Sequence, residues 1–295
     1  MKNTVQKMII RSAESIAALL ILLLVVIGLS VFVCSWAIKV TQYDVPLDGL
    51  QNQARLVVVA DTHGKVFGKD NEPLFKKVAA QHPDAIILLG DLFPSDPVEN
   101  DVEYVIDLTR RMQSIAQVYF AMGNHEKTYT TRYGDGWLNS LADTGAIVLA
   151  ENWGDYSIAG NTVRLGSTLG HGFRFGRSGA AYQASPEYAV LSALENSPYP
   201  PILLAHMPDT VAFEDSKINW HIDLVLSAHT HGGVIRIPGK GGLYVPMQGW
   251  WPRYDYGEIM LNEKMRMIIT SGLSGHGKVP RVFNLPEIAV VDLYP

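Results

Sequence analysis

The chain has 295 residues, a formal net charge of −5 and no run rich in Lys and Arg, which argues against nucleic acid as a main partner. Its single cysteine excludes an internal disulfide framework. The length suffices for one large domain with an ample core, even when the apolar N-terminal segment is set aside.

The first predicted element is an uncharged apolar segment, Ser15 to Ile38. Its 24 residues would extend about 36 Å as a helix, which exceeds a bilayer core of about 30 Å. We therefore predict that residues 1–40 comprise a short cytoplasmic segment and one transmembrane helix at about residues 15–38. The membrane is thus an expected partner.

The charges on either side of this segment predict its orientation. Lys2, Lys7 and Arg11 precede it, whereas Lys39 alone follows it directly. Because positive residues are enriched on the cytoplasmic side, we expect a single-pass protein of the cell membrane with a cytoplasmic N-terminus. The remainder of the chain would then lie on the outer face.

Two other fates of the N-terminal segment stay open. Cleavage is one, because Ser35-Trp36-Ala37 offers small residues to a signal peptidase, although the apolar region exceeds the usual length of about 7–15 residues. A lipid anchor on Cys34 is the other, and the bulky Val33 before it disfavours that reading. Retention as a transmembrane helix is the favoured interpretation.

The next elements are a predicted tether at residues 41–53, which is polar and without strong periodicity, and a domain at residues 54–295. In that domain, short runs of continuous apolar residues alternate with helical patterns. Such runs are typical of strands buried on both faces, and the alternation predicts a layered α/β fold. The predicted strands are Leu56–Ala60, Ala85–Leu89, Val118–Met122, Ile202–Ala205 and Leu224–Ala228, and the predicted helices are Glu72–Gln81, Val98–Ala116, Gly136–Thr144 and Pro186–Asn196.

A side chain that can bind a metal lies at or just after the end of each predicted strand. Open α/β sheets place their sites at the carboxyl ends of strands, so we expect these side chains to converge. In an extended chain, residues i and i+2 point the same way, which lets each Asp-x-His or His-x-His pair face one site. The candidates are Asp61, His63, Asp91, Asn124, His206, His229 and His231, with His125 beside them.

The charge of this set suits a phosphate substrate. Asp61 and Asp91 contribute −2 and the other donors are neutral, so two divalent cations with +4 leave a surplus of +2. That surplus attracts a phosphate anion and lowers the pKa of bound water. Asp91 is the natural bridge, because two cations about 3.5–4 Å apart need a shared anion.

Each motif on its own has an ordinary explanation. Asp-x-His, Gly-Asp and Gly-Asn-His-Glu form good turns, and a single histidine after a buried strand is usually a hydrogen-bonded core residue. Only their ordered combination at five strand ends is specific. His125 follows a candidate ligand, so its ring can lie at the rim, where it would stabilise charge or protonate a leaving oxygen.

The ordered motifs resemble those of the calcineurin-like metallophosphoesterase superfamily over about residues 54–295. The closing stretches Ser271–Leu273, Val279–Arg281 and Leu285–Ile288 are similar to its membrane-associated bacterial phosphodiesterase branch. The resemblance implies two facing mixed β-sheets flanked by helices. It also implies one metal on Asp61, His63, Asp91 and His231, a second on Asp91, Asn124, His206 and His229, and His125 beside the scissile bond.

The resulting expectation is a membrane-anchored hydrolase of a phosphodiester or pyrophosphate bond, in a lipid-linked or nucleotide-sugar substrate. A metal-bound hydroxide would attack phosphorus in line while His125 assists the leaving alkoxide. Mixed nitrogen and oxygen donors favour Mn, Fe, Zn or Co. Two alternatives use the same residues: a phosphomonoesterase or protein phosphatase, and a non-catalytic metal-binding scaffold in the membrane.

Substrate-binding residues are not predicted, but one aromatic stretch has two readings. Gly249 to Tyr254 contains Trp250, Trp251 and Arg253. Trp and Tyr favour membrane interfaces, so the stretch could form an aromatic and cationic edge there. The ordinary reading is that its rings pack at a strand edge.

Overall fold

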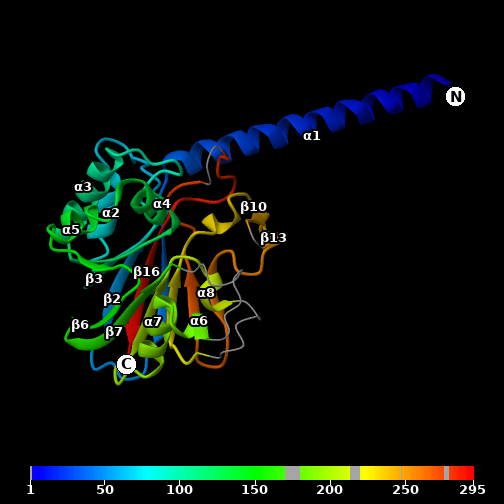
Figure 1. The fold of residues 1–295 in the computed structure, drawn as a ribbon. Helices are drawn as coiled ribbons and strands as arrows, with labels where there is room; N and C mark the ends of the chain where they lie inside the picture. The colour runs from blue at the N-terminus through cyan, green and yellow to red at the C-terminus, as the bar shows by residue number, and fades with distance from the viewer. Residues whose placement is uncertain (1, 170–179, 213–219, 247, 276–278) are drawn as a thin grey trace.

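Two six-stranded mixed sheets with helices outside them make up most of the computed structural model (Figure 1). The structure describes all residues except 1, 170–179, 213–219, 247 and 276–278. The predicted fold class is confirmed: the chain is a mixed α/β protein with facing sheets and one long apolar helix at its N-terminus.

The first sheet contains the N-terminal strands and the last strand of the chain. Its strands β2, β3, β4 and β5 run parallel, with β5 at the edge, whereas β16 is antiparallel to β2 and parallel to β1. The order is β1 (Lys39–Pro46), β16 (Glu287–Tyr294), β2 (Ala54–Val59), β3 (Ala85–Leu89), β4 (Gln117–Ala121) and β5 (Ile147–Leu149).

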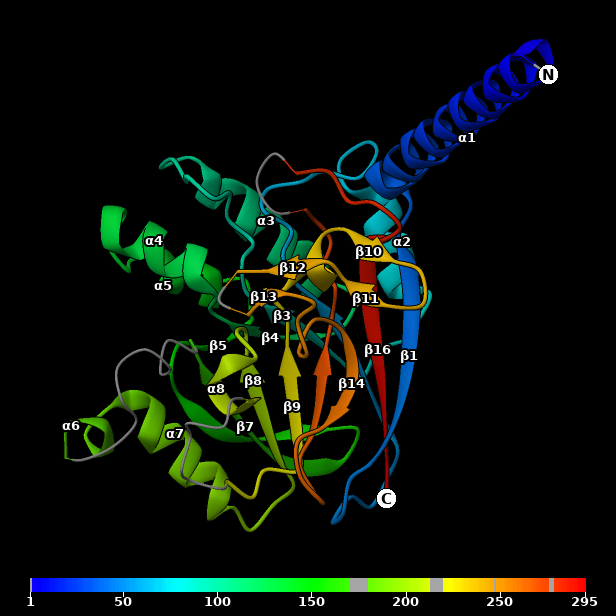
Figure 2. The same cartoon turned by 90° about the vertical axis from the view of Figure 1, so that its right-hand side faces the viewer.

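The second sheet has a parallel centre with one antiparallel strand at each edge (Figure 2). Its strands β7, β8, β9 and β15 are parallel to one another. The order is β14 (Gly257–Met260), β15 (Arg266–Ile269), β9 (Leu224–Ser227), β8 (Pro201–Ala205), β7 (Asn161–Thr168) and β6 (Trp153–Ile158).

Three hydrophobic clusters explain why the strand sequences are continuously apolar. In β2, Leu56 and Val58 join a cluster between the sheets, whereas Val57 and Val59 join a second cluster under the outer helices. Both faces of the strand are therefore covered, and alternation between apolar and polar residues is absent. A third cluster covers the outer face of β8, β9 and β15.

The outer helices match the predicted ones with shorter ends. α2 (Glu72–Ala79), α3 (Asp101–Gln113) and α5 (Trp137–Ala142) pack on the first sheet, and α7 (Pro186–Glu195) packs on the second. The Ser185 hydroxyl caps α7 by accepting a hydrogen bond from the Tyr188 amide at 3.2 Å. The short helices α6 (Ala180–Gln183) and α8 (Asp209–Ala212) complete this layer.

Two segments differ from the expectation. Residues 39–46 form strand β1, in which Tyr43 and Val45 are buried. The prediction assigns residues 39–40 to the end of the membrane segment and the rest to a tether. An edge strand covered on one face needs few apolar residues, which explains the misreading. Residues 124–133 form helix α4 (Asn124–Tyr133), although Gly-Asn-His-Glu alone reads as a turn.

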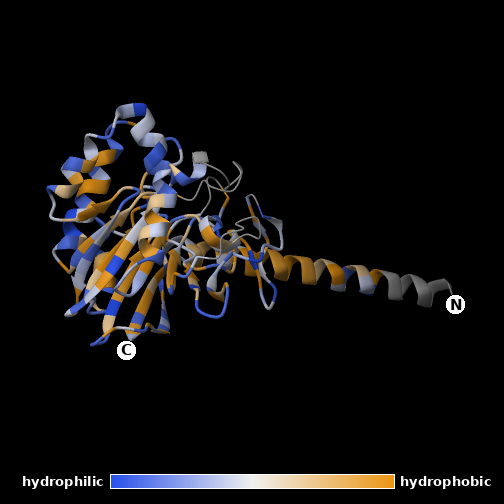
Figure 3. Cartoon of the chain, turned by 60° about the horizontal axis from the view of Figure 1, so that its bottom comes forward, coloured by the Kyte–Doolittle hydropathy of each residue, from blue (hydrophilic) through white to orange (hydrophobic). Residues whose placement is uncertain are grey.

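Helix α1 (Lys2–Trp36) projects away from the sheets (Figures 1 and 3). Its span Ile10–Trp36 is long and apolar enough to cross a membrane, and the 18-residue stretch that meets this criterion has no buried residue. Only the last turns contact the domain: Cys34 is buried, and the Phe283 amide donates a hydrogen bond of 2.6 Å to the Ser30 hydroxyl. The direction of α1 is thus set by contacts with the segment around Phe283.

Candidate metal centre

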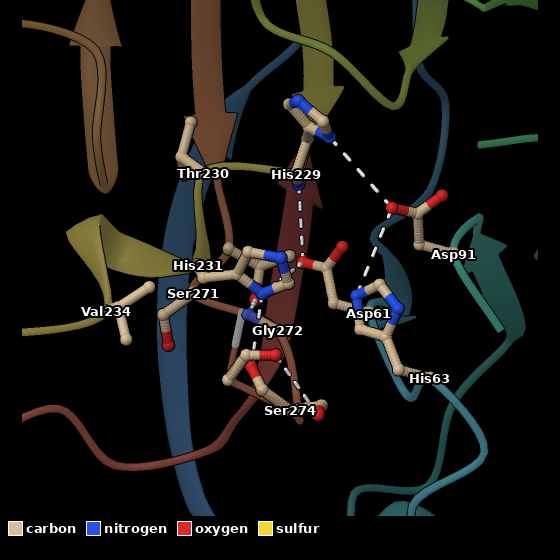
Figure 4. A network of polar contacts seen from close by, with 12 residues as sticks. Asp61, His63, Asp91, His229, Thr230, His231, Val234, Ser271, Gly272 and Ser274 are labelled. Carbon is tan, nitrogen blue, oxygen red and sulfur yellow. Dashed lines mark hydrogen bonds and ion pairs between the residues drawn. The ribbon is translucent and has the colours of Figure 1, made fainter. Parts of the chain in front are cut away.

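The predicted metal-binding side chains converge at the carboxyl ends of β2, β3, β4, β8 and β9 (Figure 4). They form three overlapping groups in which the candidate ligand atoms lie within 4.8 Å of one another. Asn124 begins α4 directly before His125 and belongs to the same place. The three groups are Asp61 with His63 and His231, His63 with Asp91 and His125, and Asp91 with His206 and His229.

Asp91 lies at the junction of these groups. Its Oδ2 atom is 3.1 Å from Nε2 of His206 and 3.9 Å from Nδ1 of His229. The same oxygen is 3.6 Å from Nε2 of His125 and 4.0 Å from Nε2 of His63. One carboxylate oxygen therefore faces nitrogens from both sides of the site, as a bridging ligand must.

Unusual backbone conformations aim these side chains. Asp61, His63, Asp91, His229 and His231 all have positive φ, between 47° and 67°. Left-handed conformations are costly for residues other than glycine, at about 1–3 kcal/mol each, and they cluster at functional sites. Such a concentration of strain in one place indicates a site that the surrounding fold maintains.

Backbone carbonyl groups orient most of the histidine rings. Nδ1 of His206 lies 2.8 Å from the Leu89 carbonyl oxygen, and Nδ1 of His63 lies 3.2 Å from that of Phe93. Because a carbonyl oxygen only accepts, each Nδ1 carries the proton and each Nε2 keeps its lone pair for the site. His125 and His231 follow the same pattern, with the Pro94 carbonyl at 2.9 Å and the Ser274 carbonyl at 3.1 Å.

The donor atoms suit divalent cations. Among the buried side-chain atoms that have no hydrogen-bond partner in the described part of the chain, five belong to predicted ligands. A cation is the group that satisfies converging carboxylate, amide and imidazole donors of this kind. The atoms are Asp61 Oδ1, His63 Nε2, Asn124 Oδ1, His206 Nε2 and His229 Nδ1.

Burial controls the protonation of the site. It lowers the pKa of His63 to about 4, and it also lowers the pKa values of His229 and His231, so these rings are neutral near pH 7. Burial raises the pKa of Asp61 to about 7, against the lowering effect of His206. His206 differs: burial lowers its pKa, but the charge and hydrogen bond of Asp91, together with the charge of Asp61 and the Leu89 carbonyl, raise it to about 10. A cation bound between these groups would displace that proton.

Glu126 is a supporting residue that the prediction did not include in the site. Its buried carboxylate accepts hydrogen bonds of 2.7 Å from the amides of Asp91, Leu92 and Gly123. It therefore joins the loop after β3 to the start of α4. The Gly-Asn-His-Glu motif contained this residue, but only the structure shows which amides it binds.

Arg281 supports the opposite side of the site. Its buried guanidinium donates hydrogen bonds to the carbonyl oxygens of Ser271, Gly272, Ser274 and Leu285. Burial lowers its pKa to about 10, against the raising effect of Asp61. The Ser274 carbonyl in turn orients His231, so Arg281 acts on the site through the backbone.

Glu287 supports the same segment. Its carboxylate accepts a hydrogen bond of 2.8 Å from the Ser271 amide, and its own amide donates one of 2.9 Å to the Gly272 carbonyl oxygen. A side chain on Gly272 would lie only 2.3 Å from Asp61 Oδ2, so glycine is required there. The resemblance included this stretch, yet no spacing rule indicated these contacts.

Residues 54–233, which contain all seven predicted ligands, match the family model described as calcineurin-like phosphoesterase. The chain belongs to this family. Among its relatives is an uncharacterised metallophosphoesterase of Campylobacter jejuni, 30% identical over 86% of this chain and 63% of its own length. The chain thus spans less than two thirds of that relative.

Two other relatives of this calcineurin-like phosphoesterase have more informative names. Phosphodiesterase YaeI of Escherichia coli is 27% identical over 72% of this chain and 71% of its own length. A bovine transmembrane protein with a metallophosphoesterase domain is 27% identical over 66% of this chain and 45% of its own length. Together with the clusters of Asp and His, these similarities support a metal-dependent phosphoesterase site.

Proposed function

We propose that this protein is a membrane-anchored phosphoesterase with two divalent metal ions, which hydrolyses a phosphodiester or pyrophosphate bond in a lipid-linked or nucleotide-sugar substrate. The observation that carries the proposal is the position of Asp91 Oδ2, which faces nitrogens of four histidines within 4.0 Å. A rigid scaffold would need no such shared oxygen. A hydrolytic centre needs it to keep two cations close together.

We assign the ligands to two positions. Asp61, His63 and His231 would bind one cation, and Asn124, His206 and His229 the other, with Asp91 shared. When bound, such cations lower the pKa of water and neutralise charge on phosphoryl oxygens. The nitrogen and oxygen donors favour Mn, Fe, Zn or Co.

His125 is the proposed proton donor to the leaving oxygen. Its Nδ1 is fixed by the Pro94 carbonyl oxygen, so Nε2 is the nitrogen that faces the site, 3.6 Å from Asp91 Oδ2. In the protonated ring, Nε2 carries the proton that a departing alkoxide takes up. Orientation by a backbone group keeps this nitrogen in place through turnover.

The membrane part of the proposal rests on α1. The buried Cys34 and the hydrogen bond to Ser30 make the end of α1 part of the domain surface, which favours retention of the helix over cleavage. The N-terminal charges then favour a domain on the outer face. The names of the Escherichia coli and bovine relatives agree with a diesterase and with a membrane location.

The reaction class is tested with two chromogenic substrates. The full chain, loaded in turn with Mn, Fe, Zn or Co, is assayed on bis(p-nitrophenyl) phosphate and on p-nitrophenyl phosphate. We expect a clear preference for the diester, and a preference for the monoester would support the phosphomonoesterase alternative. His221→Ala is a matched control, because this exposed histidine pairs with Glu195 away from the site.

Orientation is tested separately. Protease added to spheroplasts should degrade the C-terminal domain and leave a membrane-protected fragment that contains α1. If the domain is protected until the membrane is dissolved, it lies in the cytoplasm and the substrate search turns to nucleotide-linked precursors.

A further inference from the structure

An aromatic surface lies beside the metal centre. Tyr244, Trp250 and Trp251 are 45%, 68% and 54% exposed. They belong to or directly follow the hairpin of β12 (Tyr244–Val245) and β13 (Gly249–Trp250). Two adjacent exposed tryptophans are unusual on a water-facing surface, because Trp is normally well buried. The alternative reading, in which these rings pack at a strand edge, holds only in part, because Trp250 contacts Tyr244 across the hairpin while more than half of each tryptophan is exposed.

The backbone holds these rings outward. Tyr244 pairs with Trp250 across the hairpin, and their ring centroids are 5.4 Å apart. The Trp251 amide donates a hydrogen bond of 3.0 Å to the Leu243 carbonyl oxygen. Gln248 and Tyr254 exchange two hydrogen bonds of 2.8 and 3.0 Å. These contacts therefore keep the rings of Tyr244, Trp250 and Trp251 at the surface.

Two cationic side chains accompany the aromatic ones. The Lys240 ammonium lies 5.8 Å from the centre of the Trp251 ring, and the Arg253 guanidinium lies 5.2 Å from that of Tyr254. Lys240 and Arg253 are both exposed. Aromatic rings with adjacent cations match the chemistry of a bilayer interface, where rings lie at headgroup level and cations meet anionic lipids.

The direction of α1 agrees with this partner. The hairpin region, with β10 (Arg236–Ile237) and β11 (Gly241–Gly242), lies on the side of the domain from which α1 projects (Figures 1 and 2). At the base of α1, Val279 and Phe283 are exposed as well. A bilayer crossed by α1 would therefore face this side of the domain.

The hairpin region is joined to the metal centre. The Thr230 hydroxyl, between the two histidines of His-x-His, donates a hydrogen bond of 2.6 Å to the Asp255 carbonyl oxygen. The Asp255 carboxylate accepts bonds of 2.7 Å from the Gly242 amide and the Arg236 guanidinium. Because these bonds join the hairpin region to the His-x-His segment, contact of the hairpin with a membrane sets the position of the metal centre relative to that membrane.

We infer that the interfacial face, defined as Lys240, Tyr244, Trp250, Trp251 and Arg253, docks on the anionic lipid–water interface of the membrane that α1 crosses. The inference rests on the membrane anchor of the proposed function. Docking places the metal centre at headgroup level, where phosphodiesters attached to lipids are concentrated. The substrate class that this geometry favours is lipid-linked.

Quenching of tryptophan fluorescence tests the inference on the full chain. The protein is reconstituted in vesicles of phosphatidylcholine and phosphatidylglycerol, with and without brominated acyl chains, which quench nearby tryptophans. We expect the Trp250→Phe/Trp251→Phe variant to lose emission that brominated lipid quenches in the parent protein. The matched control is Trp153→Phe, because Trp153 is 40% exposed on β6, far from α1, and should lose only unquenched emission.

The outcomes separate the anchor from the docking face. Trp36 at the end of α1 reports the anchor, so Trp36→Phe should also lose quenched emission. If Trp36 is quenched while Trp250 and Trp251 are not, the docking face is overturned and the anchor stands. If Trp36 is not quenched and the protein does not float with the vesicles, the anchor and the docking face both fail. Activity on the soluble diester measures the metal centre independently.

A charge variant adds a second readout. Lys240→Ser/Arg253→Ser should lower the increase in quenching that phosphatidylglycerol causes over phosphatidylcholine alone. The control Lys76→Ser removes an exposed cation from α2 and should leave that increase unchanged. If the increase in quenching is the same in the two variants, the cations of the interfacial face do not contact lipid. A protein partner would then be the better explanation of the exposed rings.

Discussion

The two sides of the metal centre are supported in different ways. On the side of Asp91, Asn124 and His125, the support is Glu126, which belongs to the same motif and binds amides only 35 residues away. On the side of Asp61 and His231, the support comes from Arg281 and Glu287, in a segment beyond residues 54–233 that match the family model. The family match thus contains all the candidate ligands, but it does not contain Arg281 and Glu287, which support one side of the site.

The largest effect is expected where both sides meet. Asp91→Asn leaves the backbone contacts of this residue possible but removes the negative charge that two cations share. Activity should fall by more than the about 10–100-fold that loss of an outer supporting residue causes. Elemental analysis of the purified variant should show loss of metal, and full metal content with normal turnover would exclude a bridging role.

The next prediction concerns proton transfer to the leaving group, with metal binding left intact. His125→Ala should lower kcat by about 10²–10⁴-fold, because the proton donor is lost. Metal content should stay near that of the parent protein, since His125 is not one of the assigned ligands and all four groups remain for each cation. Unchanged turnover in the loaded variant would remove His125 from the reaction, and absence of turnover in the loaded parent protein would favour the non-catalytic scaffold.

Glu126→Gln breaks the support on the Asp91 side. The glutamine NH2 group would face amide donors that now bind a carboxylate oxygen, at about 1–3 kcal/mol for each unsatisfied donor. Thermal unfolding should therefore occur at a lower temperature. Metal affinity should fall by about 10–100-fold at the position of Asn124, His206 and His229. A stability equal to that of the parent would contradict the support assigned to this carboxylate.

Arg281→Lys breaks the support on the other side with a smaller effect. A lysine cannot donate to four carbonyl groups with the geometry of a guanidinium, so the segment that orients His231 should loosen. We expect the cation at Asp61 and His231 to be lost first in a titration with chelator, with affinity lower by about tenfold. Arg55→Lys is the control, because Arg55 pairs with Asp292 at the opposite end of β2 from the ligands.

The candidate ligands could be predicted because each is adjacent to a recognisable strand. Leu56–Val59 and Ala85–Leu89 are apolar throughout, so the first polar residue beyond each run, Asp61 or Asp91, follows a strand end. Helix α4 was missed because a glycine followed by polar residues also suits a turn. Strand β1 was missed because it is an edge strand, covered on one face, and its polar residues resemble a linker.

The supporting contacts depend on tertiary structure. Arg281 and Glu287 are buried charges, and a sequence pattern offers no sign that a charged side chain will be buried. Their partners are backbone groups whose positions are decided by the packing of β16 against β2. The exposed state of Trp250 and Trp251 likewise follows from the hairpin conformation.

The sequence by itself indicated the succession of the main strands, the candidate ligands and the apolar N-terminal helix, because these depend on local hydrophobicity and on spacing. The tertiary structure alone decided which oxygen of Asp91 faces the histidines, which carbonyl groups orient their rings and from which side of the domain α1 projects. These features depend on distances between segments far apart in the chain, and no local pattern encodes such distances.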